Sequence, residues 1–178
     1  MTHQDSAGYD VFRVDDAGMV LLWPFLPHYF ESLGMVRDGQ FVDAAANHRA
    51  VHLMRFLASG EWALTEPLLL LSKLMCGLSP STLLMPTEAA PTESELALSD
   101  SLLRAVIQRW AQVKNTSIEA LRETFLMREG LLERRAAQDG ARHLKVHRRT
   151  VDELVDLLPW SIWSIQNSWM PQPLRVRW

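Results

Sequence analysis

The first two-thirds of the chain repeats apolar residues at helical spacing. Between residues 22 and 33 they recur every three or four positions, and Pro24 is suited to the first turn of a helix. Asp43 and Thr65 each precede a further apolar stripe, so we expect each of them to cap a helix. The pattern therefore predicts three helices whose apolar faces are buried together.

A longer helix is predicted after Thr92. Thr92 and Glu95 have the spacing of a capping box, and an apolar stripe follows as far as residue 110. Thr116 and Glu119 repeat this spacing before another apolar stripe. The preceding segment 79–91 contains three prolines and predicts an extended connection over the surface.

From residue 131 onward the pattern alternates between apolar and polar positions. Residues 131–135 and 143–149 are two short alternating runs, and the turn residues 139–140 between them predict a β-hairpin. A capped helix is expected at residues 150–158, where a proline follows. Residues 174–178 alternate again and predict a strand of the same sheet.

These elements predict an α+β protein, with a mostly helical N-terminal two-thirds followed by a small antiparallel β-sheet with one helix. We expect residues 1–178 to form a single domain. Within it, we expect residues 1–13 to be a flexible N-terminal tail and residues 14–130 the helical part. Residues 131–178 would then form the β-hairpin, the helix and the C-terminal strand.

Composition narrows the classes of function. The chain has 178 residues, a formal net charge of −3 and 48% hydrophobic residues, so it can bury a sizeable core and lacks the broad basic charge of a nucleic-acid binder. Its one cysteine, Cys76, excludes an internal disulfide and fits a reducing compartment. No signal peptide is evident, and no apolar run reaches the roughly 20 residues of a membrane span. We expect a cytoplasmic protein.

No strong pattern of catalytic or ligand-binding residues is present. His48 and His52 are four residues apart, a spacing at which two imidazoles can share a metal ion, but no third ligand is identifiable. A packed or solvated pair is the favoured interpretation. The basic stripe at residues 143–149 could bind phosphate locally, although a solvated strand face is again favoured. We therefore expect no enzyme activity, no catalytic residue, no cofactor and no metal.

Aromatic residues next to prolines are concentrated near both ends of the chain. Trp and Phe dominate the energetics of cores and interfaces, and proline stiffens the backbone beside them. Trp160, Trp163 and Trp169 are difficult to bury together, whereas Trp110 and Trp178 are expected in the core. The C-terminal strand could also be a sheet edge that accepts a strand of a neighbouring chain. The candidates for partner contact are Trp23, Phe25, Tyr29, Trp160, Trp163, Trp169, Met170, Arg175 and Arg177.

Short motifs follow one another in a specific order along the chain. They include Leu21-Leu22-Trp23-Pro24-Phe25, Ala50-Val51-His52-Leu53, Leu57-Ala58-Ser59-Gly60, Lys73-Leu74-Met75-Cys76-Gly77-Leu78, Lys114-Asn115-Thr116-Ser117, Arg128-Glu129-Gly130 and Leu158-Pro159-Trp160-Ser161. In this order they resemble the conserved region of the contractile injection system tape measure family. The resemblance extends over residues 14–178.

This resemblance implies a structural role in a phage-tail-like particle, with contacts to the tube, spike or baseplate and self-association as a further option. A ruler of hundreds of ångströms needs hundreds of helical residues at about 1.5 Å each. We therefore expect this chain to be the terminal domain of a ruler, a short paralogue that docks at a tube end or baseplate, or an adaptor that loads cargo. We expect it to be made in the cytoplasm and assembled into the particle. The alternative is a cytoplasmic adaptor or chaperone-like module that binds injection cargo, and a hydrolytic enzyme ranks third.

Overall fold

The protein combines one large β-sheet with a layer of helices. The computed structural model describes residues 9–62, 65–135 and 141–178. The strands of the large sheet, in spatial order, are β1 (Tyr9–Val14), β4 (Gly130–Arg135), β5 (Arg142–Val146), β7 (Leu174–Arg177) and β6 (Ser164–Ile165). Two short strands, β2 (Val36–Arg37) and β3 (Gln40–Phe41), form a separate antiparallel pair.

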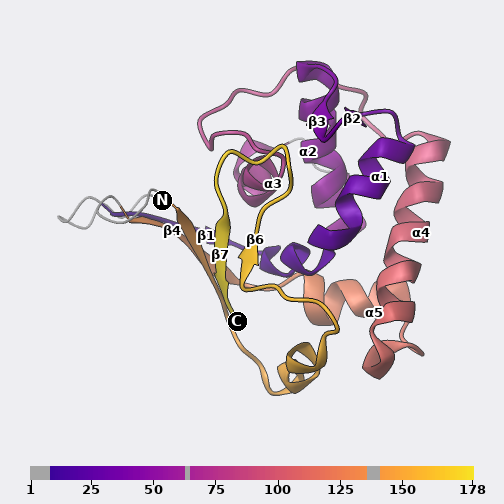
Figure 1. Ribbon diagram of the computed structural model, residues 1–178, viewed down its shortest axis with the longest axis vertical. Helices are drawn as coiled ribbons and strands as arrows, with labels where there is room; N and C mark the ends of the chain where they lie inside the picture. The colour runs from indigo at the N-terminus through magenta and orange to yellow at the C-terminus, as the bar shows by residue number, and fades with distance from the viewer. Residues whose placement is uncertain (1–8, 63–64, 136–140) are drawn as a thin grey trace.

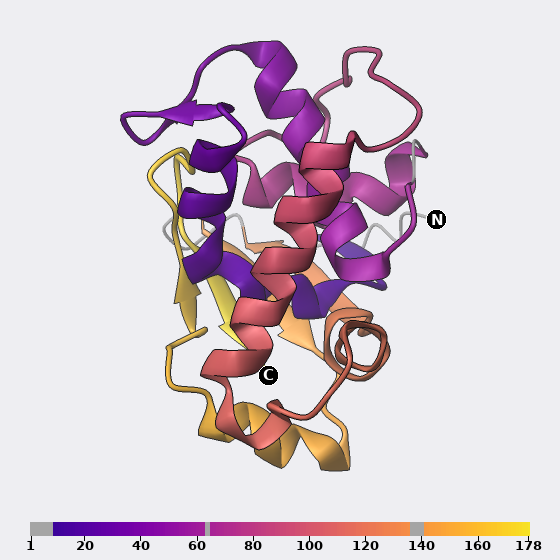
Figure 2. The same ribbon diagram turned by 90° about the vertical axis from the view of Figure 1, so that its right-hand side faces the viewer.

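The main α-helices are α1 (Leu26–Ser32), α2 (Ala44–Ser59), α3 (Leu70–Met75), α4 (Glu93–Arg109) and α5 (Ile118–Leu121). Five shorter or irregular helical segments connect them: η1 (Ala17–Phe25), η2 (Glu66–Leu69), η3 (Ala111–Val113), the π-helical η4 (Arg122–Leu126) and η5 (Thr150–Leu157). Helices α1, α2, α4 and α5 lie on one side of the large sheet (Figure 1). Seen from that side, α4 is the outermost helix (Figure 2).

The predicted arrangement of a helical part followed by an antiparallel sheet was wrong. Strand β1 comes from residues expected to lie in a flexible tail and at the start of the helical part, and it pairs antiparallel with β4. Strand β7 pairs parallel with β5, so the large sheet is mixed. Strands β2 and β3 also interrupt the helical part. A strand is stabilised by a partner that can be distant in sequence, and local periodicity does not identify that partner.

The local predictions were more successful. The side chain of Asp43 caps α2 by accepting a hydrogen bond from the Ala46 N–H, and Thr92 and Glu95 form a complete capping box at α4. Strands β4 and β5 form the predicted hairpin, although its turn at residues 139–140 lies outside the described residues. The predicted C-terminal strand is β7.

The two faces of the large sheet have different surroundings. Its inner face, which the helices cover, carries a row of buried aliphatic side chains: Val14, Leu132, Leu144, Val146, Leu174 and Val176. They join the hydrophobic cluster that also includes the apolar faces of η1, α2 and α4. The residues that alternate with them point to the outer face and are mostly polar or basic, although Val11 and Leu131 are among them. The core therefore lies between the sheet and the helices.

Candidate docking site

A largely apolar groove of about 620 Å³ lies between α1 and α4 and is bordered at one end by the segment after η5. We call it the α1–α4 groove. Its lining includes Pro24, Phe25, Leu98, Ala105, Arg109 and Trp160. The two aromatic and proline-containing segments that sequence analysis singled out thus meet at one surface feature, although more than a hundred residues separate them in the chain.

The rings of Phe25 and Trp160 form the aromatic wall of the groove. Their centroids are 5.2 Å apart and the ring planes meet at 76°, an edge-to-face arrangement that is favourable for aromatic pairs. The indole N–H of Trp160 donates to the Leu21 carbonyl oxygen at 3.1 Å. In return, the indole N–H of Trp23 donates to the Ser161 carbonyl oxygen at 2.8 Å. These reciprocal bonds hold the two segments together, so the wall is present before any partner arrives.

The floor of the groove is fixed by Tyr29, whose side chain is buried. Its hydroxyl is 2.8 Å from the Ser99 hydroxyl and so ties α1 to α4. Burial raises the pKa of Tyr29 well above its ordinary value, because an ionised phenol would lose its hydration there. At one rim, the Arg109 guanidinium lies 5.8 Å from the centre of the Phe25 ring. The groove thus combines aromatic and aliphatic walls with one exposed cation.

Trp169, another predicted contact residue, is buried in the core. Its ring lies 5.7 Å from that of Phe30 and 5.2 Å from that of Phe41, and its indole N–H donates to the Met75 carbonyl oxygen at 2.9 Å. Gly77 has a positive φ of 79°, and a Cβ there would lie 2.4 Å from the Trp169 carbonyl oxygen. Only glycine fits this close approach without a shift of the backbone.

The remaining candidates are divided between core and surface. Met170 is buried beside Trp169, whereas 55% of the surface of Trp163 is exposed next to the edge strand β6. Arg175 and Arg177 are exposed on the outer face of β7. The structure therefore brings together Trp23, Phe25, Tyr29 and Trp160, and it leaves Trp163 and the two arginines on separate surfaces.

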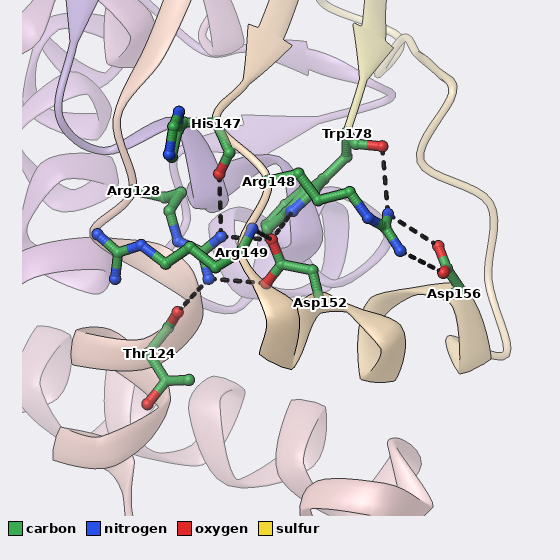
Figure 3. Close-up of polar contacts among 8 residues, drawn as sticks. All are labelled: Thr124, Arg128, His147, Arg148, Arg149, Asp152, Asp156 and Trp178. Carbon is green, nitrogen blue, oxygen red and sulfur yellow. Dashed lines mark hydrogen bonds and ion pairs between the residues drawn. The ribbon is translucent and has the colours of Figure 1, made fainter.

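Sequence analysis missed a buried polar cluster at one end of the sheet (Figure 3). The side chains of Arg128 and Asp152 are fully buried and form two hydrogen bonds of 2.5 and 2.8 Å. The Trp178 indole N–H and the Arg149 backbone N–H also donate to Asp152, each at 2.8 Å. Burial alone would raise the pKa of Asp152, but these donors hold it below its ordinary value.

This Arg128 cluster connects three parts of the chain. Arg128 also donates to the carbonyl oxygens of Thr124, in η4, and His147, after β5, at 2.6 and 3.1 Å. The cluster therefore fixes η5 and Trp178 against the end of the sheet. Arg128 belongs to the Arg128-Glu129-Gly130 motif, and that motif was the only sequence signal for it.

A second buried ion pair lies at the start of η1. Asp16 is buried and accepts a hydrogen bond from Arg55 at 3.0 Å, while Arg55 also donates to the more exposed Asp15. Burial raises the pKa of Asp16 to about 6, despite the opposing effect of Arg55. The sequence did not predict this pair.

His48, His52 and Cys76 contribute to packing. His48 accepts a hydrogen bond from the Met85 backbone N–H at 2.9 Å, and buried His52 lies with its ring 5.6 Å from that of Trp62. Cys76 is buried, and burial raises the pKa of its thiol. Over residues 9–62, 65–135 and 141–178, no group of three or more His, Cys, Asp or Glu side chains could hold a metal ion.

Comparison with known proteins gives the family. In the part of the chain that the structure describes, no helix is long and apolar enough to cross a membrane. Searches of curated proteins and of solved structures found no match. The family model described as contractile injection system tape measure protein matches residues 2–178. The chain therefore belongs to the contractile injection system tape measure protein family, and it is a structural component of such a system.

Proposed function

We propose that the protein is a non-enzymatic component of a contractile injection particle that docks on its tube, spike or baseplate through the α1–α4 groove. The observation that carries the proposal is the preformed aromatic wall of Phe25 and Trp160 beside an apolar cavity. Half-buried aromatic residues in a fixed concave surface are typical anchors of protein interfaces.

The rigidity of the groove supports this role. Trp23 and Trp160 each bond to the backbone of the other segment, and the Tyr29–Ser99 bond holds the two helices at a fixed separation. A preorganised surface loses little conformational entropy when a partner binds, so more of the contact energy appears as affinity. The groove fits an apolar helix or loop of a particle component, and Arg109 at the rim would favour an acidic residue beside it.

A charge introduced into the groove tests the proposal. Ser101→Arg places a long cation in the lining of the groove, from an exposed position on α4 where folding should tolerate it. Gln108→Arg introduces the same residue on the same helix outside the lining and is the matched control. Each tagged variant is purified from the native cells, and the co-purifying proteins are identified by mass spectrometry. Electron microscopy of the same samples shows whether particles are present.

We expect the wild-type protein and Gln108→Arg to retain tube, spike or baseplate components, and Ser101→Arg to lose them. Retention of these components by Ser101→Arg would show that another surface docks. If the wild-type protein is recovered alone, the docking role is wrong. Recovery with cargo and without particle components would replace it with the adaptor role.

A further inference from the structure

The outer face of the large sheet carries more basic than acidic residues. The strand register places Arg13, Leu131, Lys145 and Arg177 side by side in one row across four strands. The next row contains Val11, Glu133, His143, Arg175 and Ser164. Residues opposite each other in a sheet point to the same face, and so do residues two positions apart along a strand. Both rows therefore lie on one surface. We call this surface the basic sheet face.

The cations of this face have no counter-ion among the residues that the structure describes. Arg13, Lys145, Arg175 and Arg177 are exposed, and none of them takes part in an ion pair among the described residues. Arg175 donates to the Ser164 hydroxyl at 3.1 Å, which leaves its charge uncompensated. Glu133 is the acidic residue of the two rows, so the cations remain in excess.

This arrangement is unfavourable in the free protein. Lys145 is the direct partner of Arg177 across the β5–β7 pair. Like charges that face each other across two strands repel and reduce the stability of the sheet. Acidic side chains of a bound partner would remove this repulsion, and arginine can bind a carboxylate with two parallel hydrogen bonds.

A hollow of about 590 Å³ extends from the first row to η2 and α3. Arg13, Leu131 and Lys145 contribute one side of its lining, and Leu68 and Leu70 contribute the other. Leu68 is partly exposed there. Asp15, Asp16 and Glu129 also line the hollow, but the first two are bound by Arg55. The hollow has room for an apolar side chain next to the cations.

The composition of the face favours a protein over a nucleic acid. Sheets that bind single-stranded nucleic acid present aromatic side chains on which bases stack. The two rows contain no Phe, Tyr or Trp, and Val11 and Leu131 stand among the cations instead. Aliphatic and long basic side chains together suit a segment that carries both carboxylates and an apolar residue.

We propose that the basic sheet face binds an acidic segment of a protein partner, whose carboxylates contact Lys145 and Arg177 and whose apolar side chain occupies the hollow at Leu68. This site is separate from the α1–α4 groove, so the protein has two surfaces that can hold two different partner segments. The proposal does not depend on the groove being the docking site.

The test uses the purified full chain and short fluorescent peptides, with binding followed by fluorescence anisotropy at low ionic strength. The probes are a peptide of Glu and Leu, a matched peptide of Glu and Ser, and single-stranded oligothymidylate. The face variant is Lys145→Ala with Arg177→Ala. The control variant, Arg37→Ala with Lys114→Ala, removes one Arg and one Lys from exposed positions elsewhere. Circular dichroism confirms that both variants are folded.

We expect the Glu and Leu peptide to bind the wild-type and control proteins, and to bind the face variant about tenfold more weakly. Added salt should weaken the binding, because exposed charges are screened. Leu68→Ser should weaken the binding of the Glu and Leu peptide and leave that of the Glu and Ser peptide unchanged.

Three results would overturn the proposal. The first is no binding of the acidic peptides by the wild-type protein. The second is equal binding by the face and control variants. The third is tighter binding of oligothymidylate than of the Glu and Leu peptide, with a loss in the face variant, which would assign the face to nucleic acid.

Discussion

Two buried arginine–aspartate pairs hold different parts of the molecule, and burial affects their carboxylates in opposite ways. Asp152 accepts four hydrogen bonds, from Arg128, the Arg149 backbone and Trp178, and its pKa is lowered. Asp16 shares one guanidinium nitrogen of Arg55 with Asp15, and its pKa is raised. Both carboxyl groups are almost inaccessible to water.

The difference indicates that the supply of hydrogen-bond donors, together with burial, determines whether a buried carboxyl group has a raised or a lowered pKa. Loss of hydration disfavours the carboxylate in both places. Around Asp152, a bidentate arginine and two further N–H groups more than replace the lost water. Around Asp16, the neighbouring charge of Asp15 adds repulsion. The folded protein therefore favours the carboxylate form of Asp152, whereas it disfavours that of Asp16 even though Arg55 partly offsets the cost of burial.

The largest effect is expected from breaking the first pair. Asp152→Ala leaves the buried Arg128 without its counter-ion and should lower the free energy of unfolding at neutral pH by about 3–5 kcal/mol. Chemical denaturation monitored by tryptophan fluorescence measures this loss. Asp156→Ala is the control, because Asp156 pairs with Arg148 at an exposed site, where an ion pair contributes little to stability. Equal losses in the two variants would contradict the comparison.

The free energy of unfolding measured as a function of pH tests the contribution of Asp16. Its pKa is raised from 3.8 to about 6, so the folded state binds this proton more tightly than the unfolded state. The corresponding stability is present below about pH 4 and is lost as the pH rises through 6, an effect of about 3 kcal/mol. In Asp16→Asn, the free energy of unfolding should no longer fall by this amount between pH 4 and pH 7, as unfolding curves recorded across this range would show.

Asp15→Asn serves as the control for this profile. It removes the neighbouring charge but keeps the buried carboxyl group of Asp16, so a pH-dependent loss should persist. Asp152 contributes with the opposite sign: its stability is present above its ordinary pKa of 3.8 and is lost as the pH falls through the lowered folded value. If Asp16→Asn has the same profile as the wild-type protein, Asp16 is not the source of the loss.

The smallest expected effect comes from removing one donor of Asp152. Trp178→Phe deletes the indole N–H and keeps an aromatic ring near Arg128, whose guanidinium carbon lies 5.6 Å from the centre of the Trp178 ring. A hydrogen bond to a charged group contributes about 1.5–3 kcal/mol, so thermal unfolding should reveal a loss of about that size. Trp163→Phe is the matched control at an exposed position and should change stability by less than about 0.5 kcal/mol.

How much of the fold the sequence predicts depends on the distance over which each element is stabilised. Asp43 and Thr92 cap their helices as expected, because capping involves residues only three positions away. The cap of α5 is Ser117 rather than the predicted Thr116, a shift of one residue between two adjacent hydroxyl residues. Strand β1 was missed because its partner, β4, lies more than a hundred residues further along the chain.

In the candidate site, too, local features could be predicted from the sequence and contacts between distant residues could not. Phe25 and Trp160 were identified from their neighbouring prolines, but their mutual contact depends on tertiary packing. Trp169 was chosen on the same signal, but its side chain is buried, and its backbone lies close to Gly77 in a contact that local sequence does not indicate. Arg128 and Asp152 were overlooked because charged residues are mostly exposed, and pairing across 24 positions has no local signature.

The strand order has a consequence for how the protein folds during synthesis. Strand β7 is placed between β5 and β6, so the edge of β5 stays open until residues 174–177 have left the ribosome. Strand β1 is synthesised early, and its partner β4 is synthesised more than a hundred residues later. Pairing over such separations is slow, and open strand edges attract other chains. The nascent chain therefore exposes an unpaired strand edge until strand β7 has been made.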